Sequence, residues 1–98
     1  MKRVKVKEIF KKKEEYLGKE VTVAGWIRQI RDSKKIVFIE LNDGSFFKPI
    51  QIIVEEEDVD NFEEIAKLNI SASIIVKGIL EETPNSKQPF EIKSTHIW

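Results

Sequence analysis

The sequence predicts an all-β domain with accessory helices: a five-stranded Greek-key barrel. Three observations lead to this fold class. Residues 20–54 contain three β-rich runs separated by a basic turn (Ser33–Lys35) and an Asn42–Ser45 turn, and two more β-rich runs follow a short helical stretch. The runs alternate apolar and polar side chains, as half-buried strands do. With 98 residues, 41% hydrophobic and 35% charged, we expect residues 1–98 to form one domain.

The first expected elements are a helix and a long strand. Apolar residues recur at near-helical spacing from Val6 to Leu17, with Gly18 in place to end the helix. The strand spans 20–33, and Gly25 in its middle predicts a bulge or a sharp bend. Strict alternation would put Arg28 and Arg31 on opposite sides of the strand. The expected bend interrupts that alternation, so the pattern does not determine which way either side chain points.

The second and third strands are the most informative part of the chain. The two-residue period sends six aliphatic side chains inward: Val37, Ile39, Leu41, Ile50, Ile52 and Val54. Glu40 marks the opposite face as the wet one, so Phe38 and Gln51 are expected to point toward solvent. Pro49 lies near the start of the third strand, where a missing hydrogen-bond donor is tolerated.

An acidic break at 55–58 precedes the last helix and two further strands. Asp60 and Glu63 have capping-box spacing, and Asn69 is expected to end that helix. The fourth strand is expected at 71–82 with a bend at Gly78, a turn at 83–86, and the fifth strand at 89–97 with Glu91 outward. A helix between strands three and four is the plan of the OB-fold, whose second and third strands commonly hold oligonucleotides. An SH3-like barrel is the nearest alternative, and it normally lacks that helix.

Composition narrows the function classes. The chain has no cysteine, which excludes disulfides and thiolate metal sites, and we expect no metal or cofactor. No apolar run is long enough for a membrane span, so we expect a cytoplasmic protein without a membrane partner. Residues 1–35 carry 12 Lys or Arg against 5 Asp or Glu, while residues 36–98 carry 5 against 12. Positive charge gathered in one half of the chain favours a phosphate-bearing partner.

The exposed ring of Phe38 beside the amide of Gln51 predicts a surface that stacks and reads an unpaired base. The fork of Arg31 suits a phosphate or a base edge, and Arg28, Lys34 and Lys35 are expected to supply further positive charge near the ring.

Several ordered motifs carry a resemblance to a known family. They are Gly25-Trp26-Ile27-Arg28, Arg31-Asp32-Ser33-Lys34, Phe38, Asp43-Gly44-Ser45, Gln51, Ile75-Val76-Lys77-Gly78 and Pro89-Phe90-Glu91-Ile92. Together they resemble the N-terminal anticodon-binding domain of asparaginyl-tRNA synthetases, which aspartyl and lysyl enzymes share with variations. The Asp-Gly-Ser and Arg-Asp-Ser-Lys pieces favour the asparaginyl branch.

The resemblance implies a partner and roles. It implies that Phe38 stacks on the middle anticodon base, a uridine, that Gln51 and Arg31 contact the same loop, and that Glu91 lies near its bases. It also implies an asparagine tRNA as partner, a monomeric isolated domain, and no enzymatic activity in this chain, which lacks the motifs of an aminoacyl-adenylate site. Val37 departs from the glycine common in the family.

Two other functions remain open. The same face could grip a polypeptide, as a protein-interaction module or an engineered binder on this barrel would, or bind single-stranded nucleic acid without reading an anticodon. The chain could equally be a fragment, a free-standing paralogue or an engineered variant.

Overall fold

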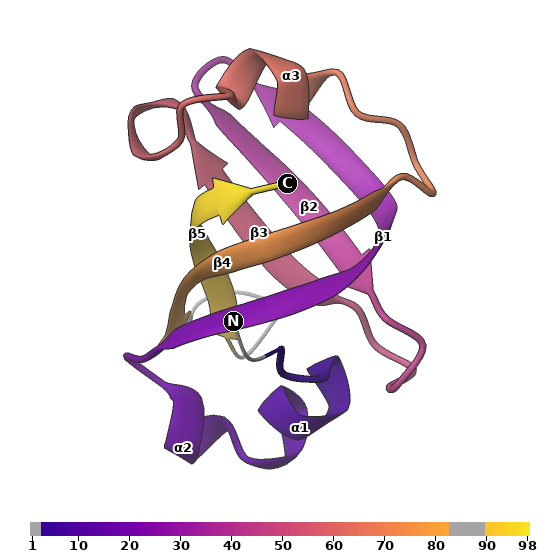
Figure 1. The fold of residues 1–98 in the computed structure, drawn as a ribbon, viewed down its shortest axis with the longest axis vertical. Helices are drawn as coiled ribbons and strands as arrows, with labels where there is room; N and C mark the ends of the chain where they lie inside the picture. The colour runs from indigo at the N-terminus through magenta and orange to yellow at the C-terminus, as the bar shows by residue number, and fades with distance from the viewer. Residues whose placement is uncertain (1–2, 83–89) are drawn as a thin grey trace.

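Five strands close into a barrel in the computed structural model, which describes residues 3–82 and 90–98. The strands are β1 (Glu20–Ser33), β2 (Ile36–Asn42), β3 (Ile50–Glu55), β4 (Ser73–Glu82) and β5 (Phe90–Ile97). Their order around the barrel is β1-β2-β3-β5-β4, and β4 also pairs with β1 (Figure 1). All neighbours are antiparallel except β3 and β5. The predicted OB-fold is confirmed; the turn expected at 83–86 lies outside the described residues, as does Pro89.

The interior is filled by the aliphatic side chains that alternation pointed inward. The six inward residues predicted in β2 and β3 are all 0% exposed. Val23 and Ile27 of β1, Val76 and Leu80 of β4, and Ile92 of β5 are also 0% exposed and join the same core. The outward residues between them, apart from Ile53, stay partly exposed. The alternation that fills the core therefore also determines which side chains form the outer wall of β2 and β3.

Strand β1 belongs to two sides of the barrel. Its residues 20–26 pair with β4 and its residues 26–33 pair with β2. The register shifts between Ile27 and Gln29, so the bulge lies at Arg28, three residues after Gly25, where a bulge or a sharp bend was expected. The change of partner strand that the bend was expected to allow takes place at Trp26, next to Gly25. Gly25 allows β1 and the end of β2 to approach closely, because a Cβ there would lie 2.3 Å from the carbonyl oxygen of Asn42. In β4, where a bend was expected at Gly78, the register with β5 shifts between Lys77 and Gly78.

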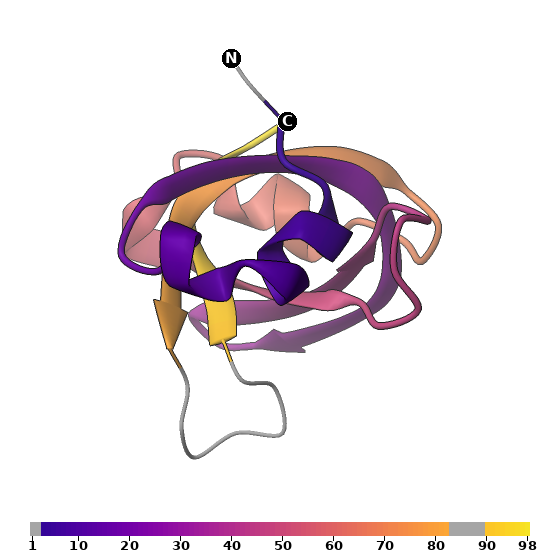
Figure 2. The ribbon, with the colours of Figure 1, turned by 90° about the horizontal axis from the view of Figure 1, so that it is seen from below.

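Short helices lie across the two ends of the barrel (Figures 1 and 2). Helix α3 (Phe62–Ala66) lies at one end, preceded by the 3-10 turn η1 (Glu56–Asp58). At the other end the single helix expected over residues 6–17 is two pieces, α1 (Val6–Lys11) and α2 (Lys13–Tyr16), which meet at Lys12. None of the helices in the described ranges is long and apolar enough to cross a membrane.

The start of α1 is held by a distant loop. The amide of Val6 donates to Asp43 Oδ2 (2.9 Å), and the amide of Lys7 donates to Ser45 Oγ (3.0 Å). Ser45 in turn donates its own amide (2.9 Å) and hydroxyl (2.6 Å) to Asp43 Oδ1. Desolvation by burial acts to raise the pKa of Asp43, but these hydrogen bonds outweigh it and leave the pKa below its usual value. The Asp-Gly-Ser motif is therefore a cap for the first helix.

The capping box expected at Asp60 is absent. The N-cap of α3 is Asn61, and neither residue caps the helix through its side chain. The side-chain Nδ2 of Asn61 instead donates to the carbonyl oxygen of Ile97 (3.1 Å), which ties α3 to the end of β5. The helix also ends at Ala66 rather than at Asn69.

Candidate nucleic-acid interface

The outer wall of β1, β2, β3 and β5 carries two parallel rows of side chains. Pairing across the strands aligns Arg31 with Phe38, Phe38 with Ile53, and Ile53 with Lys93. Two residues along each strand, it aligns Gln29 with Glu40, Glu40 with Gln51, and Gln51 with Glu91. We name the first set the aromatic row and the second the polar row. Side chains paired in this way have Cβ atoms about 4.5–5.5 Å apart, so each row forms a continuous strip.

The aromatic row presents one ring with a cation above it. Phe38 is half-buried on the outer wall, and the guanidinium of Arg31 lies 4.8 Å from the ring centroid. Ile53, the next residue in the row, is 8% exposed but belongs to the outer wall, since its neighbours Ile52 and Val54 fill the core. The ring thus rests on an apolar floor, and the prediction that Phe38 faces outward holds.

The bulge at Arg28 explains how Arg31 reaches that ring. A bulge inserts one residue and reverses the alternation beyond it, so odd positions point inward before the bulge while Gln29 and Arg31 point outward after it. Arg28 itself is exposed and has no cross-strand partner in the β1–β2 register. This settles the facing of the two arginines: Arg31 joins the aromatic row and Arg28 belongs to neither row.

The polar row contains one preset hydrogen bond. Gln51 Nε2 donates to Glu91 Oε2 at 2.9 Å, which fixes the amide and leaves its oxygen and second N–H for another partner. Glu40 forms no ion pair within 4.0 Å with any residue in the described part of the chain. The row therefore offers both donors and acceptors side by side, as the edge of a base requires.

Two more predicted residues lie at one border of this face, and Lys93 of the aromatic row, which was not predicted, lies at the other. Lys34 and Lys35 form the exposed turn between β1 and β2, next to the end of the aromatic row, and the carbonyl oxygen of Lys35 accepts the amide of Glu56 (3.0 Å). On the other border, the Lys93 ammonium lies 3.7 Å from Glu55 Oε2 and 3.8 Å from Asp58 Oδ2. Glu55 first, and then Asp58, raises the pKa of Lys93 above its usual value, so this lysine is already engaged.

Sequence reasoning missed four members of the two rows. Gln29 was missed because its facing depends on the bulge, and Lys93 and Ile53 because the parallel pairing of β3 with β5 joins segments far apart in the chain. Glu40 was used only to mark the wet face. The pairing of an outward Glu40 with an outward Gln51 across a hairpin was the one signal that could have found part of the polar row.

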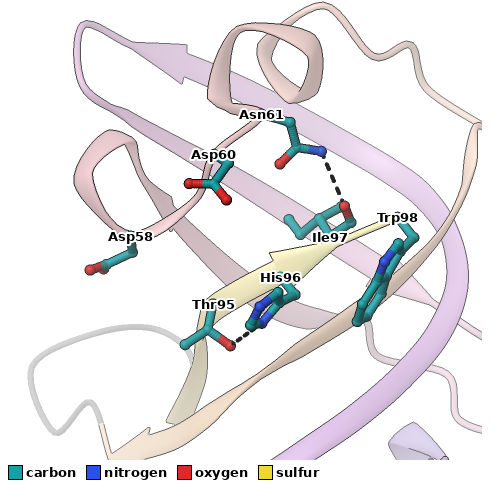
Figure 3. A pocket seen from close by; sticks show the side chains of 7 residues that line it. All are labelled: Asp58, Asp60, Asn61, Thr95, His96, Ile97 and Trp98. Carbon is teal, nitrogen blue, oxygen red and sulfur yellow. Dashed lines mark hydrogen bonds between the residues drawn. The ribbon is translucent and has the colours of Figure 1, made fainter.

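A separate pocket of about 350 Å³ lies between residues 58–61 and the end of β5 (Figure 3). His96 and Trp98 stack beside it with ring centroids 5.7 Å apart, and Thr95 Oγ1 lies 3.0 Å from His96 Nδ1. No three His, Cys, Asp or Glu side chains in the described ranges are grouped closely enough to hold a metal ion.

Comparisons with known proteins agree with this geometry. The chain is 56% identical over 97 residues to the asparagine–tRNA ligase of Acetivibrio thermocellus, a match that covers 99% of this chain and 21% of that protein. The chain thus spans about a fifth of the length of the curated relatives it matches. The structure superposes on asparaginyl-tRNA synthetase from Pyrococcus horikoshii complexed with asparaginyl-adenylate with a TM-score of 0.85 and 26% identity, covering 100% of this chain and 22% of that one.

A second similar structure is that of an OBody bound to a protein. OBody AM2EP06 bound to hen egg-white lysozyme matches with a TM-score of 0.71 and 26% identity, over 86% of this chain and 82% of that one. The family model for the tRNA anticodon domain, described as an OB-fold nucleic acid binding domain, matches residues 21–98. That match takes in all five strands, both rows and the lysine turn. The chain therefore belongs to the tRNA anticodon family of OB-fold nucleic acid binding domains.

Proposed function

We propose that the outer wall of this domain binds the anticodon loop of asparagine tRNA, and that the domain serves an asparagine–tRNA ligase. The observation that carries the proposal is the half-exposed ring of Phe38 beside the preset Gln51–Glu91 pair. The relatives that match nearly the whole chain are asparagine–tRNA ligases, which supports the choice of tRNA. The chain covers only 21% of such a protein. We therefore assign tRNA binding to these residues, and the ligation reaction to the whole ligase and not to them.

In this proposal Phe38 stacks on one unpaired base. A base stacked on an aromatic side chain contributes about 1–3 kcal/mol, whereas an exposed cation–π contact contributes about 0.5–1 kcal/mol. Stacking therefore outweighs the Arg31–Phe38 contact seen in the free domain. The base takes the place of the guanidinium over the ring, and Arg31 then pairs with a neighbouring phosphate.

The polar row reads the edge of that base. A uracil edge presents carbonyl acceptors on either side of an N–H donor, and the free N–H of Gln51 and the carboxylate of Glu91 offer the matching donor and acceptor. The existing Gln51–Glu91 bond holds both groups before RNA arrives, so little side-chain entropy is lost on binding. Arg28, Lys34 and Lys35, all exposed, contact phosphates and make binding dependent on salt.

Titration of labelled RNA tests the proposal. We expect Phe38→Ala to weaken binding of a stem-loop with a GUU anticodon by at least about tenfold, the loss of one stacked base. Glu91→Gln should reduce the preference for the GUU loop over a loop with a changed middle base, so that the two affinities become closer. Ile36→Ala is the matched control. Ile36 lies two residues before Phe38, on the same face of β2, and is also half-buried.

Two results would contradict the proposal. Equal affinity for the GUU stem-loop and a scrambled loop would leave a general single-strand binder. Unchanged affinity of a properly folded Phe38→Ala variant would remove the stacking role. We also expect the isolated domain to sediment as a monomer, and a stable dimer would refute that expectation.

A second candidate function is protein binding through the same wall. The likeness to an OBody bound to lysozyme favours it, because a related barrel of similar length carries a protein contact. Ionic strength separates the two functions. Affinity for RNA falls steeply as salt rises, since phosphate contacts release counterions, while a mainly apolar protein contact changes little.

A further inference from the structure

The end of the barrel under α1 and α2 presents an exposed aromatic ring that the outer wall does not use. Phe47, in the loop between β2 and β3, is 74% exposed, more than any other large hydrophobic residue in the described ranges. Its loop is fixed at its start, where Gly44 donates its amide to Asn42 Oδ1 (2.7 Å) and Ser45 donates to Asp43. The ring is therefore held outward by an ordered loop.

A ladder of rings anchors Phe47 to the core. Ring centroids are 4.7 Å apart between Phe47 and Phe46, 4.7 Å between Phe46 and Phe10, and 4.8 Å between Phe10 and Phe90. Phe90 is 1% exposed and immediately precedes Glu91 of the polar row. At its other end, Phe47 lies four residues before Gln51 in the chain.

One lysine lies beside the outer end of this ladder, and others lie on the helices at the same end of the barrel. Lys48 Nζ lies 5.6 Å from the Phe47 ring centroid. Lys7 and Lys11, four residues apart, share one face of α1, and the backbone of Lys7 is bonded to the same loop through Ser45. At the break between the helices, residues 10–15 line a hollow of about 350 Å³ that includes Lys11, Lys12 and Lys13.

The charge of this end is available to a partner. We name Phe47, Lys48 and the lysines at 7, 11, 12 and 13 the basic end. In the described ranges none of its lysines forms an ion pair within 4.0 Å, whereas Lys77 and Lys93 elsewhere do. Three glutamates in the helices, at 8, 14 and 15, reduce the positive charge there without cancelling it.

We propose that the basic end is a second RNA contact, in which Phe47 stacks on a nucleotide outside the loop bases held by the outer wall and the lysines bind phosphates of the adjoining strand. This inference rests on the proposed function and extends it to a longer stretch of the same RNA. A fixed ring flanked by free lysines is the combination that single-stranded nucleic acid requires. The N-terminus of α1 takes no part, because Asp43 already occupies it.

Two RNAs and two sets of variants test it: the full anticodon stem-loop, and a short strand that carries only the loop bases. Phe47→Ala should weaken binding of the stem-loop roughly tenfold and binding of the short strand much less. Replacing Lys11, Lys12 and Lys13 by Gln should lower the slope of log K against log salt by about 2 for the stem-loop. Phe38→Ala should weaken both RNAs alike.

Matched controls follow α3 in the chain, and α3 itself lies at the end of the barrel opposite α1 and α2 (Figure 1). Ile70 is 60% exposed, so Ile70→Ala removes a comparably exposed apolar side chain, and Lys67→Gln removes an exposed lysine. Melting curves check that each variant is folded, which the exposure of Phe47 leads us to expect.

The outcomes separate this inference from the proposed function. If Phe38→Ala weakens binding while Phe47→Ala and the lysine variant behave as wild type, the second contact is overturned and the proposed function stands. If the basic-end variants weaken binding and Phe38→Ala does not, the second contact stands and the outer wall loses its role. If the wild type binds neither RNA, both are overturned.

Discussion

Replacing Asp43 by Asn is expected to destabilise the domain by loosening α1 from the barrel. The carboxylate accepts from the amide of Val6 with one oxygen and from the amide and hydroxyl of Ser45 with the other. An asparagine keeps one acceptor oxygen and turns an NH₂ group toward an amide that also donates. Losing an N-cap costs about 0.5–2 kcal/mol, and hydrogen bonds to a charged group contribute about 1.5–3 kcal/mol. Since Asp43 is only partly buried, we expect a loss of ~1.5 kcal/mol.

Thermal unfolding followed by circular dichroism measures this loss. For a domain of this size, 1 kcal/mol corresponds to roughly 4–8 °C in Tm, so Asp43→Asn should melt about 6–12 °C below the wild type at pH 7. The control is Asp60→Asn, the same substitution at a residue whose side chain caps nothing in the described structure. It should leave Tm almost unchanged.

The difference between wild type and Asp43→Asn should also depend on pH. The folded-state pKa of Asp43 lies below its usual 3.8. The stability that the carboxylate contributes is therefore complete well above pH 3.8 and is lost as the pH falls through the lowered pKa. Equal melting at pH 7, or a difference that persists in full after the carboxyl is protonated, would refute the reasoning.

Two further substitutions test the barrel itself. Gly25→Ala places a Cβ 2.3 Å from the carbonyl oxygen of Asn42, so the strands must separate, and urea unfolding should show a loss of at least about 2 kcal/mol. A Gly25→Ala variant with the wild-type midpoint would contradict the close approach. Ser94→Ala removes a fully buried hydroxyl that donates to the carbonyl oxygen of Ile53 (2.9 Å) and should cost about 1 kcal/mol. If its unfolding midpoint does not move, that hydrogen bond contributes nothing to stability.

The part of the interface within one hairpin could be predicted from the sequence. Phe38 and Gln51 point outward because Val37, Ile39, Ile50 and Ile52 must point inward, and a slip of one residue would expose them all. The turn lysines follow from the same hairpin. Glu91 was placed near the bases only by resemblance, and its bond to Gln51 depends on a parallel pairing between strands separated by β4. Such pairings leave no local signal.

The break in the expected first helix has a cause in the tertiary structure. The helix expected over 6–17 breaks at Lys12, because its first half packs Phe10 against Phe46 and Phe90 while its end joins the sheet at Leu80 through Leu17. One straight helix cannot satisfy both contacts.

The sequence by itself determined which face of each strand is buried, and hence five strands, a closed core and an outward ring. The reason is that the alternation of apolar and polar residues within each strand shows which side chains must be buried. Only the tertiary structure decided where β1 bulges, which loop caps α1, and which four strands line up the polar and aromatic rows. Those features depend on backbone groups and side chains from distant segments, which come into contact only when the barrel closes.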